Sequence, residues 1–169
     1  FFGALGLMGY NYYNEYRAEK VSREIVDLLS SEYEAKKSTD TTLLPDYVIN
    51  PDMEMPKKEI DGHEYIGKIE ILSKGLSLPV ISEWSVNNFK YAPCRYEGTP
   101  YKNDFIIAAH NYRGHFAELK NLIQGDSVIF TDMNNNQFIY EVIYTEVLDK
   151  TSVEQMSEGE WDLTLFTCT

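Results

Sequence analysis

Short runs rich in β-branched and aromatic residues, separated by turn residues, fill most of the chain beyond residue 64. Such runs suit a pleated, half-buried surface, and many of them in succession favour a sandwich or a barrel. A single helical pattern interrupts them at residues 115–123, and Gly125 ends it. The sequence therefore predicts an all-β fold with short helices. The expected strands are 65–72, 76–81, 105–109, 127–131, 138–147 and 162–168.

The N-terminal third follows other patterns. Residues 1–9 are apolar and uncharged, but a membrane span needs about 20 such residues, and no basic n-region of a signal peptide precedes them. We interpret them as the remnant of an N-terminal membrane anchor. Residues 10–37 are predicted to form a helix with a narrow apolar stripe. This helix is either a free stem or packs its stripe on the following domain. Residues 38–58 hold three prolines and are predicted to be a linker, so the folded domain covers residues 59–169.

Two of the expected strands end on reactive side chains. His110 follows the strand at 105–109, and Cys168 ends the strand at 162–168. Cysteine is a nucleophile as the thiolate, and a nearby imidazolium favours that form. The two residues are distant in sequence, but such partners meet in the fold. The pair therefore indicates covalent catalysis.

These residues resemble the signature of the sortases, the cysteine transpeptidases that attach proteins to the Gram-positive cell wall. Residues 164–168 read Thr-Leu-Phe-Thr-Cys and match the family's Thr-Leu-x-Thr-Cys, while residues 109–111, Ala-His-Asn, match its histidine motif. Both motifs stand in the family's order, and the resemblance runs from about residue 59 to the end. It implies a closed sortase β-barrel of about eight strands with an N-terminal helical stem. Cys168 and His110 would be the catalytic residues.

The resemblance also implies the reaction and its partners. The enzyme would cleave a Leu-Pro-x-Thr-Gly-like sorting signal between threonine and glycine through a thioacyl intermediate. It would then transfer the protein to an amine of a cell-wall precursor or a pilin, without a cofactor or a metal. The expected location is the cell membrane, with a single span and an extracellular catalytic domain. Residues expected to bind substrate are Thr167, Ala109 and Asn111.

Two features bear on the class and the activity. The short segment between the last two strands argues against class B and favours a housekeeping or class D-like sortase. In the family, an arginine on the strand after the cysteine completes the site, and this sequence ends one residue past Cys168. Neither Arg95 nor Arg113 lies where the motif would put it. We expect a truncated catalytic domain with reduced activity, and the alternative is a catalytically silent barrel that acts as a binding or assembly module.

Other functions fit the sequence less well. A net charge of -12, from 27 acidic and 15 basic residues, repels phosphate backbones, so no nucleic-acid partner is expected. His115 competes with His110 for the role of base but is expected to cap or pack the short helix. No spacing typical of a zinc site links the histidines and cysteines. Cys94 is expected to be a packed thiol. Papain-like proteases and L,D-transpeptidases order their cysteine and histidine differently.

Overall fold

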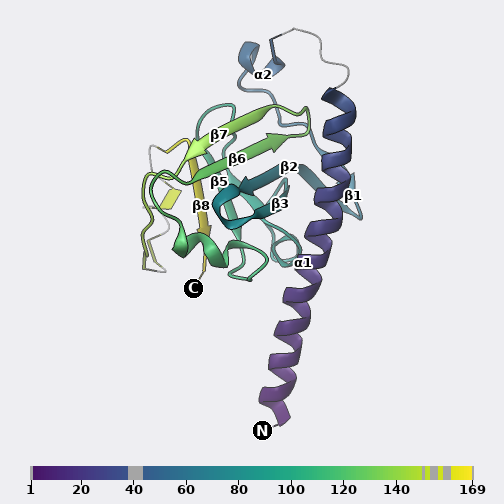
Figure 1. Ribbon diagram of the computed structural model, residues 1–169, viewed down its shortest axis with the longest axis vertical. Coiled ribbons are helices and arrows are strands. Elements are labelled where there is room, and N and C mark those ends of the chain that lie inside the picture. The colour runs from purple at the N-terminus through teal and green to yellow at the C-terminus, as the bar shows by residue number, and fades with distance from the viewer. Residues whose placement is uncertain (1, 38–43, 150, 153–155, 158–160, 169) are drawn as a thin grey trace.

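The computed structural model describes residues 2–37, 44–149, 151–152, 156–157 and 161–168, with the backbone alone for residues 2–5. A long helix, α1, lies against a curled sheet (Figure 1). The α-helices are α1 (Phe2–Lys37) and α2 (Asp46–Ile49), and the 3-10 helices are η1 (Leu72–Lys74), η2 (Asn88–Lys90) and η3 (Phe116–Asn121). The strands are β1 (Lys58–Ile60), β2 (His63–Ile71), β3 (Leu76–Ile81), β4 (Cys94–Glu97), β5 (Phe105–Ala109), β6 (Ser127–Asp132), β7 (Gln137–Glu141) and β8 (Leu163–Thr167).

The eight strands of the described residues belong to one sheet, whereas the resemblance implied about eight strands for the complete domain. Their order is β7-β6-β2-β3-β4-β5-β8, and β1 pairs with β2 beside this path. The β3–β4 and β5–β8 pairs are parallel, and the others are antiparallel. Two parts of the prediction need correction. Within the described residues the sheet is a curled half-barrel whose outer strands, β7 and β8, are not paired with each other, so closure is not observed. The term all-β is also too narrow, because α1 alone holds 36 of the 169 residues.

A bulge in β2 lets the sheet curl. The pairing of β2 with β3 shifts register between Tyr65 and Gly67. Gly67 has a φ of 155°, and a Cβ at this position would lie 2.1 Å from the backbone oxygen of Thr131 on β6. Only glycine permits so close an approach, and a bulge bends the strand that carries it. β2 can therefore pair with β3 on one side and with β6 on the other.

The larger hydrophobic core lies on the inner face of the sheet, the face that carries Phe105 and Ile107 of β5. Both side chains have no exposed surface, and neither has Phe130 of β6. Fully burying one such side chain contributes about 1.5–3 kcal/mol before the entropy of ordering it is counted. Leu163 and Leu165 add the inner face of β8 to this core. The strand that ends next to Cys168 is therefore anchored by alternate side chains.

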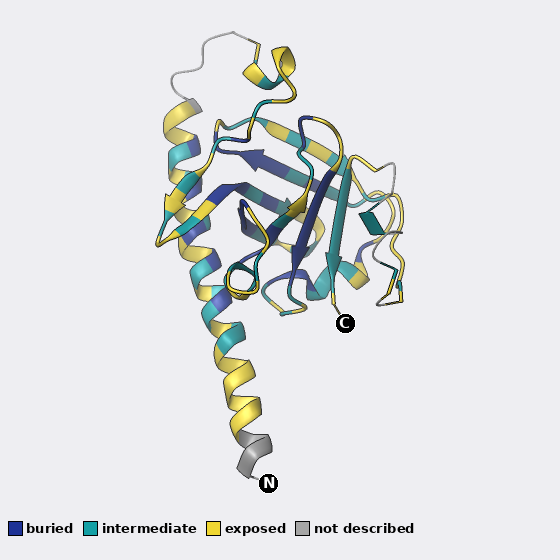
Figure 2. Cartoon of the chain, turned by 180° about the vertical axis from the view of Figure 1, so that it is seen from behind, coloured by how far each residue is buried: buried dark blue, intermediate teal, exposed yellow. Residues whose placement is uncertain are grey.

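Helix α1 packs on the opposite, outer face of the sheet. Its buried side chains recur every three or four residues and form one stripe, seen in dark blue along α1 in Figure 2. Together with residues of β2, β3 and β4, part of this stripe makes a second core. Of the two possibilities that the sequence left open, the helix therefore packs on the domain. The stripe consists of Ala18, Ser22, Ile25, Leu29 and Tyr33.

The N-terminal part of α1 projects beyond the sheet (Figure 1), and its tyrosines at positions 10, 12, 13 and 16 are exposed. None of the helices in the described part of the chain combines the length and apolar character that crossing a bilayer requires. In α1, charged residues recur from Glu15 onward. This finding contradicts the prediction of a single-pass membrane protein.

The described part of the predicted linker packs against the sheet, while residues 38–43 lie outside the described part. The ring of Tyr47 in α2 stacks on Tyr101 with 4.8 Å between centroids, and Met55 is buried in the inner core. Asp52 forms an ion pair with Lys102. Because Tyr101 and Lys102 precede β5, this segment covers the end of the half-barrel opposite to His110.

The packing of α1 predicts opposite outcomes for two neighbouring leucines. Leu29 is fully buried against the sheet, whereas Leu28 is 50% exposed. We expect Leu29→Ala to lower the free energy of unfolding by about 2–5 kcal/mol, through lost burial and a cavity. The matched control Leu28→Ala should cost less than about 1 kcal/mol. Urea unfolding followed by circular dichroism measures both, and equal values would mean that α1 is not docked as described.

Candidate active site

Two parallel strands bring the predicted catalytic residues to one edge of the sheet. β5 and β8 pair in register, and the last pair joins Ala109 to Thr167. His110 and Cys168 are the next residues on these strands. In Figure 2, β5 and β8 lie side by side and point the same way, toward the C-terminal label. Because neighbouring strands are about 4.8 Å apart, the register brings the imidazole and the thiol into adjacent positions.

Strand alternation places both side chains on the same face. Phe105, Ile107 and Ala109 point into the inner core, so Ala108 and its partner Phe166 point to the outer face. Positions 110 and 168 continue the outer series on their strands. A ring contact supports this assignment, because Phe89, which packs on the outer core, lies 4.2 Å from the ring of His110.

The imidazole of His110 packs against two aromatic rings. Phe89 contacts it on one side, and Tyr112 stacks on it at 4.6 Å between centroids with 24° between planes. Burial, followed by the nearby charge of Lys90, holds the pKa of His110 below its ordinary value. These surroundings favour the neutral imidazole, and an adjacent thiolate would act in the opposite direction by favouring the charged form.

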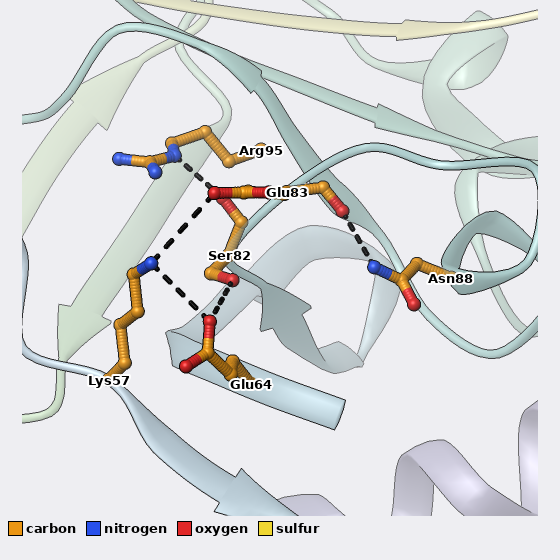
Figure 3. A network of polar contacts seen from close by, with 6 residues as sticks. All are labelled: Lys57, Glu64, Ser82, Glu83, Asn88 and Arg95. Atoms are coloured by element: carbon orange, nitrogen blue, oxygen red, sulfur yellow. Dashed lines mark hydrogen bonds and ion pairs between the residues drawn. The ribbon is translucent and has the colours of Figure 1, made fainter. Parts of the chain in front are cut away.

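A polar network fixes the segment that carries Phe89. Arg95 donates from Nε to the backbone oxygen of Ser82 at 2.7 Å, and Asn88 donates from Nδ2 to the backbone oxygen of Glu83 at 3.0 Å. Phe89 follows Asn88 directly, so these bonds help to set its place against His110. Figure 3 shows the whole network, which comprises Lys57, Glu64, Ser82, Glu83, Asn88 and Arg95.

The predicted site residues besides His110 differ in their exposure and in the face of the sheet on which they lie. Cys168 is exposed and free, and Asn111 is also exposed. Ala109 has no exposed surface and belongs to the inner core. Thr167 is half-buried, and its Oγ1 has no hydrogen-bond partner among the described residues. By alternation Thr167 and Ala109 face inward, away from the face of the sheet that carries the thiol and the imidazole.

His115 is buried beneath α1. It has no exposed surface, and its Nε2 lies 3.4 Å from the hydroxyl of Ser22. Burial, with a smaller contribution from His110, lowers the pKa of His115 to about 4, while a hydrogen bond to the backbone of Ala18 acts in the opposite direction. The expectation that His115 packs rather than reacts therefore agrees with its position.

Three aromatic residues that the sequence analysis did not single out extend along the outer face. Phe166 meets Tyr96 edge to face at 5.2 Å, and Tyr96 lies 6.5 Å from Trp84. Residues 82–84 and 95–98 line an open cavity of about 440 Å³ there. Phe166 could have been found, because it stands two residues before Cys168 on the same face. Trp84 and Tyr96 gave no sequence signal. Tyr96 reaches Phe166 only through the pairing of β4 with β5 and of β5 with β8, and Trp84 follows β3, which pairs with β4.

The second cysteine differs from Cys168. Cys94 is fully buried, and burial raises its pKa to about 12, so it is a packed thiol as expected. Across the described ranges, no cluster of three His, Cys, Asp or Glu side chains is placed to hold a metal ion. The site thus offers an exposed thiol next to an imidazole, a pair that can act as a nucleophile and its base, beside an aromatic surface.

Comparisons with known proteins identify relatives of this chain. The family model described as Sortase domain matches residues 69–169. The chain is 29% identical over 170 residues to Sortase A of Bacillus anthracis, an alignment that covers 96% of this chain and 80% of that protein.

Solved structures show the same fold. A Clostridium perfringens Sortase D5 transpeptidase superposes with a TM-score of 0.61 at 20% identity, covering 89% of this chain and 90% of that one. Clostridium perfringens sortase C with the C-terminal cell wall sorting motif superposes with a TM-score of 0.54 at 22% identity, covering 96% and 90%.

The burial of His115 predicts a loss of stability in acid. The unfolded chain takes up a proton near the ordinary histidine pKa of about 6.5, whereas the folded chain does so only near pH 4. Between these values the unfolded state binds more protons, so stability falls as the pH falls. Lowering the pH from 7 to 5 should cost about 2 kcal/mol through this group.

Urea unfolding at both pH values, compared with His115→Gln, isolates the contribution of His115. The variant should be less stable at pH 7 but should lose about 2 kcal/mol less on acidification. An equal pH dependence in both proteins would show that His115 titrates normally in the fold.

Proposed function

The chain belongs to the sortase family, which consists of cysteine transpeptidases that anchor proteins or pilins, and we propose that it cleaves a Leu-Pro-x-Thr-Gly-like sorting signal between threonine and glycine. In this proposal Cys168 is the nucleophile and His110 is the general acid and base. The observation that most supports these roles is the parallel pairing of β5 with β8, which ends with Ala109 beside Thr167. A housekeeping or class D-like enzyme is the proposed class, and the similarity to Sortase A over 96% of the chain supports the choice.

In the first step the Cys168 thiolate attacks the carbonyl carbon of the threonine residue in the signal. The carbon–sulfur bond forms, and the carbonyl electrons move to oxygen to give a tetrahedral oxyanion. When the carbonyl re-forms, the carbon–nitrogen bond breaks, and the protonated imidazole of His110 gives its proton to the departing glycine nitrogen. The products are a thioacyl enzyme and the free C-terminal fragment.

In the second step an amine of a cell-wall precursor or a pilin attacks the thioester. Neutral His110 takes the proton that the amine loses, and the carbon–sulfur bond breaks to return the Cys168 thiolate. One amide replaces another, so no ATP is needed. The exposed position of Cys168 leaves room for a protein-sized acceptor to reach the thioester.

The outer aromatic surface is the proposed groove for the sorting signal. Phe166 precedes Cys168 by two residues and faces the same side, and its contact with Tyr96 extends an apolar wall away from the thiol. An extended peptide with leucine and proline side chains would bury apolar area against such a wall. The sortase C structure with a sorting motif supports the substrate class.

Variants of the two cysteines and two histidines test the assignment. With a fluorogenic sorting peptide and a primary amine acceptor, Cys168→Ala should abolish both cleavage of the peptide and the thioacyl adduct of the enzyme, because the nucleophile is lost. His110→Ala should lower kcat/KM by about a hundred- to ten-thousandfold, the usual contribution of general acid–base catalysis. Mass spectrometry of the quenched enzyme and the products measures both the adduct and the transfer.

Two controls accompany these variants. Cys94→Ala should keep the adduct, and His115→Gln should stay within about tenfold of the parent, because neither side chain reaches the outer surface. An adduct that persists in Cys168→Ala would refute the nucleophile, and a larger loss in His115→Gln than in His110→Ala would move the base to His115. Peptide binding without any adduct in the parent would favour the silent binding module.

A further inference from the structure

One stretch of α1 holds the loop that follows His110. The carboxylate of Glu15 accepts a hydrogen bond from the backbone nitrogen of Arg113 at 2.7 Å. One turn later, Gly114 lies so close to the side chain of Glu19 that a Cβ would meet it at 2.9 Å. A further turn on, Ser22 lies beside His115. Residues 113–115 are therefore docked, one after another, along two turns of the helix.

This loop also sets one wall of the His110 site. Tyr112 lies between His110 and the docked residues, since its ring stacks on His110 at 4.6 Å and approaches His115 at 5.6 Å. The backbone oxygen of His110 accepts a hydrogen bond from the nitrogen of Phe116 at 3.2 Å. A shift of the loop away from α1 would thus move Tyr112 and uncover the imidazole.

The same stretch of α1 supports the segment that carries Phe89, the other ring in contact with His110. The guanidinium of Arg17 lies 4.7 Å above the ring of Tyr91, and Val21 and Phe89 pack on the same outer core. Tyr91 follows the 3-10 helix that carries Phe89. Residues 15–22 of the helix therefore contact both segments whose rings enclose His110.

We propose that Glu15 is a positioning residue for His110, and that it acts by fixing the 112–115 loop, and with it the Tyr112 ring, against α1. A carboxylate that accepts from a backbone N–H makes a charge-assisted bond of roughly twice the neutral strength. Glu15 also precedes the buried stripe along α1, and burial of the stripe's apolar side chains is what stabilises the packing of the helix on the sheet. Its effect should therefore fall on the geometry of the imidazole more than on stability. The catalytic part of this inference rests on the proposed role of His110.

NMR titration of His110 tests the positioning and needs no activity. In Glu15→Ala the loop loses its hydrogen bond to α1 at Arg113, while the contacts of Gly114 and His115 with the helix remain. The loosened loop should admit water to His110, so the pKa of His110 should rise toward the ordinary value, because burial is the main cause that lowers it. Coulomb's law alone predicts the reverse, since the loss of a nearby negative charge lowers a histidine pKa. Charged and titratable groups that face the imidazole are the same in every variant: Lys90, Tyr112, His115 and, by the strand register, Cys168.

Two variants are matched controls. Glu15→Gln keeps an oxygen acceptor for the Arg113 nitrogen without the charge, and it should restore the parent titration. Glu24→Ala removes an exposed carboxylate of the same helix that contacts Lys20, and it should change nothing. A His110 pKa in Glu15→Ala that is unchanged or lower would overturn the proposal, as would a rise of equal size in Glu24→Ala.

Kinetics separate this inference from the proposed function. Glu15→Ala should lower kcat for peptide cleavage by about tenfold, a fraction of the loss that misplacement of a catalytic group can cause, with KM within about twofold. Thermal melts should place Glu15→Ala within a few degrees of the parent. A parent that forms no adduct refutes the function and leaves the NMR result to decide the positioning. An active parent whose kcat is unaffected by Glu15→Ala refutes the positioning alone.

Discussion

The in-register parallel pairing of β5 with β8 is the constraint on which the site depends. Side chains alternate along a strand, so a shift of one residue would turn Cys168 to the inner face and leave His110 on the outer face. The alternate residues Ile107 and Leu165 hold the register, because both must enter the inner core. The apolar pattern of the two strands therefore places His110 and Cys168 at neighbouring positions of adjacent strands, on the same face.

Helix α1 contributes to the site from the same outer face of the sheet. Its buried stripe covers the outer core, and its residues near Glu15 hold the loop beyond His110. Rings from two segments, Phe89 and Tyr112, then enclose the imidazole. The geometry of one side chain thus depends on contacts that span the chain from the first helix to the last strand.

Local patterns predicted most of the sheet and missed what depends on pairing. The strands 76–81 and 105–109 were predicted at their observed bounds, because apolar runs between turn residues define them. β1 and β4, with three and four residues, are too short to show alternation. The expected strand at 138–147 is confirmed only as far as Glu141. The motifs selected His110 and Cys168 as candidate site residues, whereas the rings of Phe89 and Tyr112 beside His110 could not be predicted, because only the fold brings them together.

Interstrand nuclear Overhauser effects between β5 and β8 test the central claim most directly. In the labelled chain, contacts between backbone protons should join Ala109 to Thr167 and Ala108 to Phe166, followed by a contact between the His110 ring and the β protons of Cys168. Contacts displaced by one residue, or an antiparallel pattern, would place the thiol and the imidazole on opposite faces or at opposite ends. Either result would contradict the site described.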